Sequence, residues 1–335
     1  MLKYIKKYWY FAIWAPIFMI GEVCMDLLQP SFLTKIIDEG VNGLHNNGMP
    51  DLNIILTNGL IMIGLVVLGG IFGVLSGVFA NLCSQNFAND LRCDCFRRVM
   101  HLSFEQTDYF ETGSLVTRIT NDVTQIQNLV GLLIRGFVRT FMLFGGGIFC
   151  MLMLDLSFGI VLACALPLVI IFVIIFIRKA SPKFKILQKK IDNLNSVLQE
   201  NVSGARVVKA YVKEEYEENR FEEANSSLVG TQRYVLKLFS LMQPITNIIL
   251  NLSIVAIIYV GGIHVKTNQG MTTGQIMAAI TYISRILMAV LNMANLFQTA
   301  SRAQASSIRI KEIIRPITVI SYGSFKEETS AYGTI

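Results

Sequence analysis

The chain has 335 residues, of which 53% are hydrophobic and only 16% are charged, and its mean hydropathy is +0.53. Because about a quarter of the residues in soluble domains are charged, a water-soluble fold of this size is excluded and a polytopic membrane protein is indicated. The net charge of +6 does not indicate nucleic-acid binding, since the basic residues lie at the ends of apolar segments rather than on one face.

Six apolar segments are long enough to cross a bilayer, which takes about twenty helical residues. Asp155 alone separates the third segment from the fourth, and it predicts a tight hairpin. The expected fold is an all-α membrane protein with six transmembrane helices and long cytoplasmic helical extensions. The predicted spans cover approximately residues 11–36, 54–81, 134–154, 156–177, 238–264 and 272–300.

Lysine and arginine residues gather at the ends of these segments, and all of the basic ends fall on one side when the spans alternate. Cytoplasmic loops carry the excess of such residues. We therefore expect a multi-pass protein of the cell membrane with both termini and both long insertions in the cytoplasm. The basic residues are Lys3, Lys6, Lys7, Arg92, Arg97, Arg98, Arg178, Lys179, Lys183, Lys185, Lys189, Lys190, Arg302, Arg309 and Lys311.

Two long polar insertions, near residues 83–133 and 178–236, are predicted to continue the flanking helices into water. Residues 183–200 keep an apolar stripe at helical spacing, and the second span runs on through Phe96 without a helix breaker. An extension of about 25 residues would reach about 35–40 Å beyond the membrane. The chain is expected to reverse near Gly113 and near residues 213–218.

Each insertion carries one motif. The first is the run YFETGSLVTRITNDV at residues 109–123, in which Arg118 and Asp122 lie four positions apart and are expected to brace the returning helix. The second combines Glu200 and Gly204 with the run RVVKAY at residues 206–211. Aromatic residues in both motifs are available to fill a groove on a soluble partner. The alternative is ordinary helix capping with solvated charges.

Together, on two insertions of a six-span chain, these motifs resemble the transmembrane half of type I ATP-binding-cassette exporters. The resemblance runs over residues 1–314 and implies the type 1 transmembrane domain of that family. The short segment from Phe110 to Gly113 is similar to the Gram-positive heterodimeric branch, often described as multidrug exporters.

The resemblance implies the permease half of an ATP-driven exporter, working beside a second exporter subunit, expected to form a heterodimer, in a lipid bilayer without nucleic acid. It implies that two short coupling helices, near residues 103–112 and 210–218, insert into nucleotide-binding domains. The residues implied for this coupling are Phe104, Tyr109, Phe110, Gly113, Arg118, Asp122, Glu200, Gly204, Arg206, Tyr211 and Glu214.

A phosphate-binding loop of the form G-x-x-x-x-G-K-[ST] does not occur in this sequence. We therefore expect no catalytic residue and no bound cofactor in this chain, with ATP and Mg²⁺ on a partner or missing nucleotide-binding domain. Residues 315–335 do not resemble the family's linker, and they suggest a truncated, frameshifted or split reading frame. Two alternatives stay open, a non-transporting fragment and an ATP-independent secondary transporter; the substrate is not indicated.

Three charged residues lie far from both ends of the apolar segments that contain them. Glu22 and Asp26 share a face of the first span, and Arg285 lies at a matching depth in the sixth. Each would cost about 2.5–3.5 kcal/mol facing lipid at a helix centre, so they are expected to face the interior or a wet cavity. They predict either a structural ion pair or a carboxylate site for cationic substrates. The scattered cysteines and histidines predict no metal site.

Overall fold

The computed structural model describes residues 2–44, 48–102, 110–267 and 270–314, which are helical apart from short turns and caps. Six helical segments within these ranges are long and apolar enough to cross a membrane, which confirms the predicted six-span helical fold. These segments are Trp9–Val41, Leu52–Met100, Thr112–Leu154, Leu156–Ser203, Glu214–Lys266 and Thr273–Ile314.

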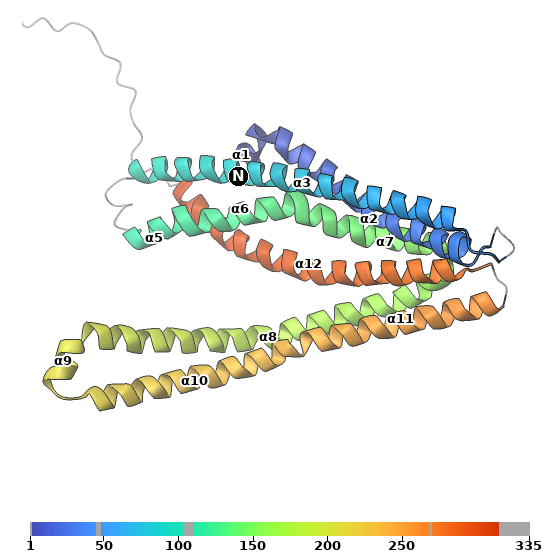
Figure 1. Ribbon diagram of the computed structural model, residues 1–335. Helices are drawn as coiled ribbons and strands as arrows, with labels where there is room; N and C mark the ends of the chain where they lie inside the picture. The colour runs from blue at the N-terminus through green and yellow to red at the C-terminus, as the bar shows by residue number, and fades with distance from the viewer. Residues whose placement is uncertain (1, 45–47, 103–109, 268–269, 315–335) are drawn as a thin grey trace, which may run out of the picture. The chain divides into compact units, whose positions relative to one another are not determined.

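Several segments are divided by π-helical turns, labelled η, or by short breaks (Figure 1). The elements in chain order are α1 (Leu2–Lys7), α2 (Trp9–Lys35), η1 (Ile36–Val41), α3 (Leu52–Met100), α5 (Thr112–Thr117), η2 (Arg118–Asp122), α6 (Val123–Gly131), η3 (Leu132–Phe137), α7 (Val138–Leu154), α8 (Leu156–Ser203), α9 (Ala205–Ala210), α10 (Glu214–Ser240), α11 (Met242–Lys266) and α12 (Thr273–Ile314).

The long helical extensions predicted from the two insertions are present. Helix α3 has 49 residues and α8 has 48, so each continues well past its apolar segment. The hairpin predicted at Asp155 is also present, because this residue alone separates α7 from α8. Its backbone is extended, and its side chain caps α8 by accepting a hydrogen bond from the Ser157 amide at 2.6 Å.

The chain divides into two compact units. The first holds the described parts of residues 1–20, 71–138 and 295–335. Its core joins the second half of α3 to α6 and to the end of α12, which lie together in Figure 1. The buried members are Phe87, Ala88, Leu91, Cys95, Val123, Ile126, Val130 and Ile310. Because Val123, Ile126 and Val130 follow helical spacing, α6 turns one apolar face to this core.

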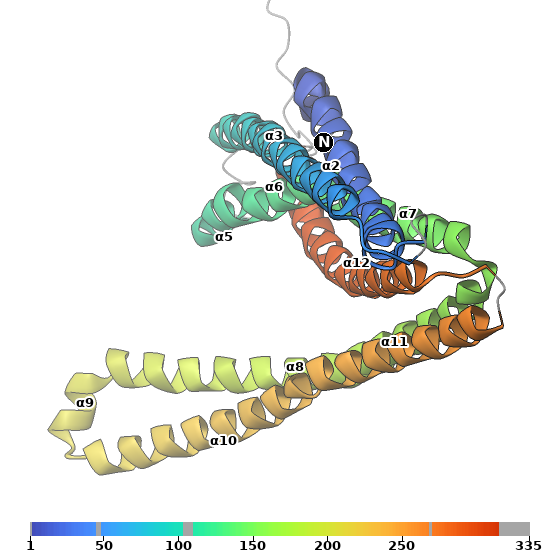
Figure 2. The ribbon, with the colours of Figure 1, turned by 45° about the vertical axis from the view of Figure 1, so that its right-hand side comes forward.

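The second unit holds residues 21–70 and 139–294. Its longest feature is a hairpin in which α10 and α11 run back along α8 after the short helix α9, as Figures 1 and 2 both show. Elsewhere in this unit the buried hydroxyl of Tyr282 in α12 donates a hydrogen bond to the Leu27 carbonyl of α2 at 2.8 Å. That bond fixes the register between these two helices.

Candidate functional site

A buried carboxylate in the first unit joins the returning arm of the first insertion to the end of α12. Asp122 is 1% exposed and ends the π-helical turn η2, directly before the apolar face of α6. Its Oδ1 accepts a hydrogen bond from Ser306 Oγ at 2.8 Å, and its Oδ2 accepts one from Arg309 Nε at 2.7 Å. A further bond from Arg309 makes the contact bidentate. Bidentate guanidinium–carboxylate pairs are strong and fix geometry.

The electrostatics of Asp122 favour its ionised form. Burial raises the pKa of this carboxyl group, but hydrogen bonds from Arg309 and Ser306 and the charges of Arg309 and Arg118 outweigh burial. The net effect lowers the pKa of Asp122 below its usual range. The pKa of Arg309 is raised, chiefly by its hydrogen bond to Asp122. This pair is therefore charged at neutral pH.

Arg118 makes a second link to α12. Its Nη1 donates to Glu312 Oε2 at 2.7 Å and to the Arg309 carbonyl at 2.8 Å, and its guanidinium lies 4.8 Å from the centroid of the Phe110 ring. Such stacking is a favourable cation–π contact. Phe110 is thus a support for Arg118 in this structure. We call the contacts of Arg118 and Asp122 with Ser306, Arg309 and Glu312 the α12 clamp.

The structure agrees with only part of what is expected for the first insertion. Arg118 and Asp122 do not bond to each other, because both side chains reach α12 instead. The reversal lies between the end of α3 at Met100 and the start of α5 at Thr112, so Gly113 follows it directly, in the first turn of α5. Phe104, Tyr109 and most of the predicted coupling helix 103–112 lie outside the described residues.

In the second insertion the reversal differs from the prediction. Helix α8 ends at Ser203, Gly204 caps it, α9 ends at Ala210, and α10 begins at Glu214. The expected single helix over residues 210–218 is therefore wrong. Val212 has a φ of 51°, a left-handed conformation that a β-branched residue seldom adopts and that interrupts the helix.

The tip of this hairpin exposes several large apolar side chains on a stretch that is otherwise polar. Tyr211 is 74% exposed, and Arg206 and Glu214, which are predicted to take part in coupling, are also exposed. We call the exposed apolar residues here the tip surface; they are Val202, Val207, Tyr211, Val212 and Tyr216. Below them Arg220 pairs with Glu200 at 2.6 Å and with Glu217 at 3.4 Å, which ties α8 to α10. Arg220 is not among the residues predicted from the sequence.

A cluster of four charged side chains lies among the apolar parts of the second unit. Arg139 of α7 bonds to Glu22 and lies 3.4 Å from Asp26, both on α2. Arg285 of α12 lies 3.3 Å from Asp26 and 3.5 Å from the Gln29 side chain. The two acids and two bases give this cluster no net charge, which lowers the free-energy cost of removing the four side chains from water. All four side chains are partly buried.

The three charged residues predicted from the sequence all belong to this cluster. Arg285 pairs with Asp26 of α2, whereas Glu22 pairs with Arg139. Arg139 is not among the residues predicted from the sequence, and it lies near the start of the predicted span 134–154. It lies five residues inside that span, where an arginine needs a carboxylate partner. The two acids of the first span were therefore the signal that Arg139 would join this cluster.

A further acidic residue that sequence reasoning did not select caps α12. Asp38 is buried in η1, and its Oδ1 accepts a hydrogen bond from the Gly274 amide at 2.8 Å while Thr272 donates to Oδ2. The first amides of a helix lack partners within the helix, and a carboxylate there also favours the helix dipole. Asp38 therefore fixes the end of α2 to the start of α12.

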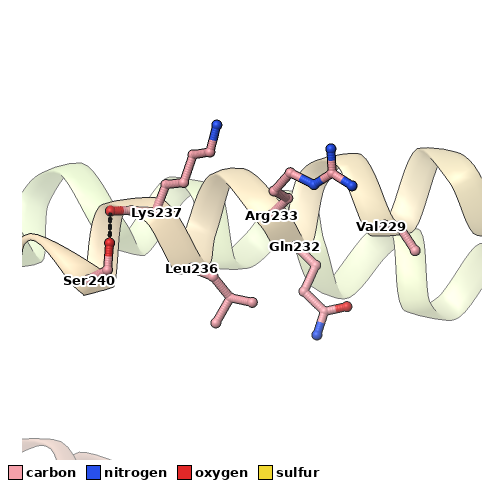
Figure 3. A pocket seen from close by; sticks show the side chains of 6 residues that line it. All are labelled: Val229, Gln232, Arg233, Leu236, Lys237 and Ser240. Carbon is pink, nitrogen blue, oxygen red and sulfur yellow. Dashed lines mark hydrogen bonds between the residues drawn. The ribbon is translucent and has the colours of Figure 1, made fainter.

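An open depression of about 440 Å³ lies along α10 and is lined from that helix alone. Figure 3 shows its side chains, with Arg233 and Lys237 pointing to the same side of the helix. The lining residues are Val229, Gln232, Arg233, Leu236, Lys237 and Ser240. They include no carboxylate. This surface is shallow and basic, and it lies where α10 approaches the apolar helix α11.

Comparison with known proteins places this arrangement in a family. Residues 13–291 match the ABC transporter transmembrane region. The chain is 32% identical over 313 residues to an uncharacterised ABC transporter ATP-binding protein of Bacillus subtilis, YfiB, covering 93% of this chain and 53% of that protein.

Two other relatives are also named as ABC transporter ATP-binding proteins. An uncharacterised ABC transporter ATP-binding protein of Mycobacterium tuberculosis is 30% identical over 288 residues, covering 86% of this chain and 48% of that protein. A second Bacillus subtilis protein of this kind, YknU, is 24% identical over 306 residues, covering 90% of this chain and 50% of that protein. The chain spans about half the length of these curated relatives. With six apolar helices and a match over most of its length, the chain belongs to the ABC transporter transmembrane family.

Proposed function

We propose that the chain is the permease part of an ATP-driven exporter. In this proposal it pairs with a second exporter subunit, as a heterodimer, to enclose a translocation pathway. Nucleotide-binding domains supply the hydrolysis of ATP with Mg²⁺. The relatives named as ABC transporter ATP-binding proteins support an exporter-type role. Multidrug transport is the substrate class that we propose from the resemblance to the Gram-positive branch.

The observation that carries this proposal is the tip surface. Contiguous exposed apolar side chains far along a polar helical extension are costly in water and mark a protein contact. Tyr211 and Tyr216 flank a shallow hollow of about 380 Å³ that is also lined by Val207. Such a surface suits insertion into a groove of an ATPase domain. The α12 clamp offers a second route for coupling in this proposal, because it links the first insertion to the end of α12.

The experiment joins the chain after Ile314 to the ATP-binding domain of a relative and produces it with a partner subunit in inside-out vesicles. Accumulation of a hydrophobic fluorescent dye and ATP hydrolysis are measured together. We expect Tyr211→Ala to lower dye accumulation per ATP by about fivefold or more, since truncating an interface aromatic costs more than about 1 kcal/mol. The control is Tyr234→Ala, which removes an exposed aromatic of the same hairpin away from the tip surface.

Equal coupling in Tyr211→Ala and Tyr234→Ala would contradict a docking role for the tip surface. Dye accumulation without nucleotide would instead support the secondary-transporter alternative.

We further propose that both termini and both insertions face the cytoplasm. The one-sided distribution of basic residues supports this orientation. In a cysteine-free background, a single cysteine at Met49, which is exposed between α2 and α3, should react with an impermeant reagent outside intact cells. A cysteine at Glu215 should not react, and reaction there would reverse the orientation.

A further inference from the structure

The membrane-proximal half of the hairpin formed by α8 and α10 has an extreme charge pattern. Directly after the apolar run 156–177, α8 carries six basic residues before its next acidic residue, Asp192. The facing stretch of α10, residues 228–240, carries two basic residues and no acidic one. We call these eight residues the basic patch; they are Arg178, Lys179, Lys183, Lys185, Lys189, Lys190, Arg233 and Lys237.

The two helices pack against each other at this level, so the basic patch belongs to one structure. Lys183 Nζ of α8 lies 5.0 Å from the ring centroid of Tyr234 of α10. One helical turn away, the ring of Phe239 meets Phe184 with centroids 5.3 Å apart and Phe176 with centroids 5.0 Å apart. These aromatic contacts hold the basic side chains of both helices beside the same boundary of the apolar region.

The charges of the basic patch are not neutralised by the protein that the structure describes. Arg220, nearer the tip, pairs with two glutamates, whereas no member of the basic patch forms an ion pair with a described residue. In Figure 3 Arg233 and Lys237 extend together from one side of α10. The depression there offers further donors from Gln232 and Ser240 and no carboxylate.

The position of the basic patch fits the polar face of a bilayer. Arg178 and Lys179 follow one apolar run directly, and Lys237 precedes the other by one residue. The headgroup layer is about 5–8 Å thick on each side of the hydrocarbon core. At 1.5 Å per residue, Arg233 and Lys183 lie about 8–9 Å from the apolar runs, at the outer edge of this layer, which their long side chains can reach. Long basic side chains extend along such an interface, and exposed tyrosines such as Tyr234 favour it.

We propose that the basic patch binds the headgroups of anionic phospholipids in the adjoining leaflet. Lipid phosphates supply the negative charge that the described protein lacks at this level. A basic side chain beside an anionic membrane surface contributes about 1 kcal/mol, or about fivefold in association. Several such side chains on two packed helices therefore select anionic over zwitterionic lipid. This inference does not depend on ATP coupling.

The experiment reconstitutes the unaltered chain into phosphatidylcholine bilayers that contain either spin-labelled phosphatidylglycerol or spin-labelled phosphatidylcholine. The fraction of motionally restricted label gives the relative association of the two lipids. We expect phosphatidylglycerol to be preferred, with the preference falling as salt rises because ions screen the interaction. The variant Lys183→Gln, Lys185→Gln, Arg233→Gln, Lys237→Gln should lower the preference by about threefold or more.

The control removes three basic charges at the other end of the same hairpin, with Arg206→Gln, Lys209→Gln and Lys213→Gln. These residues lie at the tip, away from the apolar runs. The control should keep the lipid preference of the unaltered chain. Equal loss in both variants, or no preference in the unaltered chain, would overturn the proposal, because charges that serve only to orient the spans need no bound lipid.

Two further outcomes would show that the basic patch binds something other than lipid headgroups. If inorganic phosphate abolishes the preference at an ionic strength where chloride does not, the basic patch is a site for soluble anions. If an acidic protein segment covers the patch, the lipid preference stays near one in every variant. Both outcomes overturn the proposal. Should the fourfold variant fail to insert, the pair Arg233→Gln with Lys237→Gln, both exposed on α10, provides the test against Lys209→Gln with Lys213→Gln.

Discussion

Asp122 and Arg309 lie 187 residues apart in the sequence and form a bidentate ion pair whose carboxylate is almost completely buried. The pair joins the end of the π-helical turn η2 to the last turns of α12. The end of α12, the last helix that the structure describes, is thereby fixed to the returning arm of the first insertion.

We expect Asp122→Asn and Arg309→Gln each to destabilise the protein by about 1–3 kcal/mol. Breaking a buried pair costs more, but Arg309 is half exposed and water compensates part of the loss. The double variant should lose less than the sum of the two, since neither charge is then left unpaired. Thermal unfolding in detergent is the measurement. Arg302→Gln, on the same helix and exposed, is the control and should change little. Additive losses would contradict a direct pair.

The stability supplied by Asp122 should depend on pH in a defined direction. Because the pKa of Asp122 is lower in the folded protein than its unfolded value of about 3.9, its contribution is present above that value. The contribution is lost as pH falls through the lower, folded-state pKa. The difference in Tm between the unaltered chain and Asp122→Asn should therefore be constant above about pH 5 and shrink in stronger acid. A difference that grows on acidification would refute this assignment.

The charge cluster predicts unequal effects for its two arginines. Arg139→Gln should destabilise more than Arg285→Gln, because Arg139 contacts both carboxylates of α2 and Arg285 contacts one. The pair Glu22→Gln with Arg139→Gln should recover part of the loss. Thermal unfolding again measures this. If Glu22→Gln instead spares stability and selectively lowers transport of cationic dyes, Glu22 is a substrate ligand, a role suggested by its buried Oε2, which accepts no hydrogen bond from a described residue.

Glycine at position 274 should be essential for the junction of α2, η1 and α12. A Cβ atom there would lie 2.6 Å from Asp38 Oδ2 and 2.7 Å from the Thr34 carbonyl oxygen. Gly274→Ala should therefore destabilise by about 1–3 kcal/mol through overpacking. Gly262→Ala is the matched control, because a Cβ at Gly262 in α11 meets nothing within 4 Å. Comparable Tm values for the two alanine variants would contradict this prediction, because they would show that the residues around position 274 accept a Cβ atom at little cost in stability.

The sequence by itself determined the helices and their order. A run of about twenty apolar residues must form a helix in lipid, so the six spans follow from hydrophobicity alone. The hairpin at Asp155 follows because two such runs leave a single residue between them. The helical stripe after Lys183 likewise predicts the extension of α8. Each of these inferences depends on residues close together in the chain.

Only the tertiary structure decided which charged residues meet. The spacing of Arg118 and Asp122 suggested that they bond to each other, whereas each bonds to α12. The π-helical turns η2 and η3 turn the faces that follow them relative to a continuous α-helix, so local spacing does not reveal that Arg139 faces α2. Pairing across helices depends on their rotation and register, which packing over the whole unit sets. A local pattern therefore identifies the charge that needs a partner, and the packed fold selects the partner.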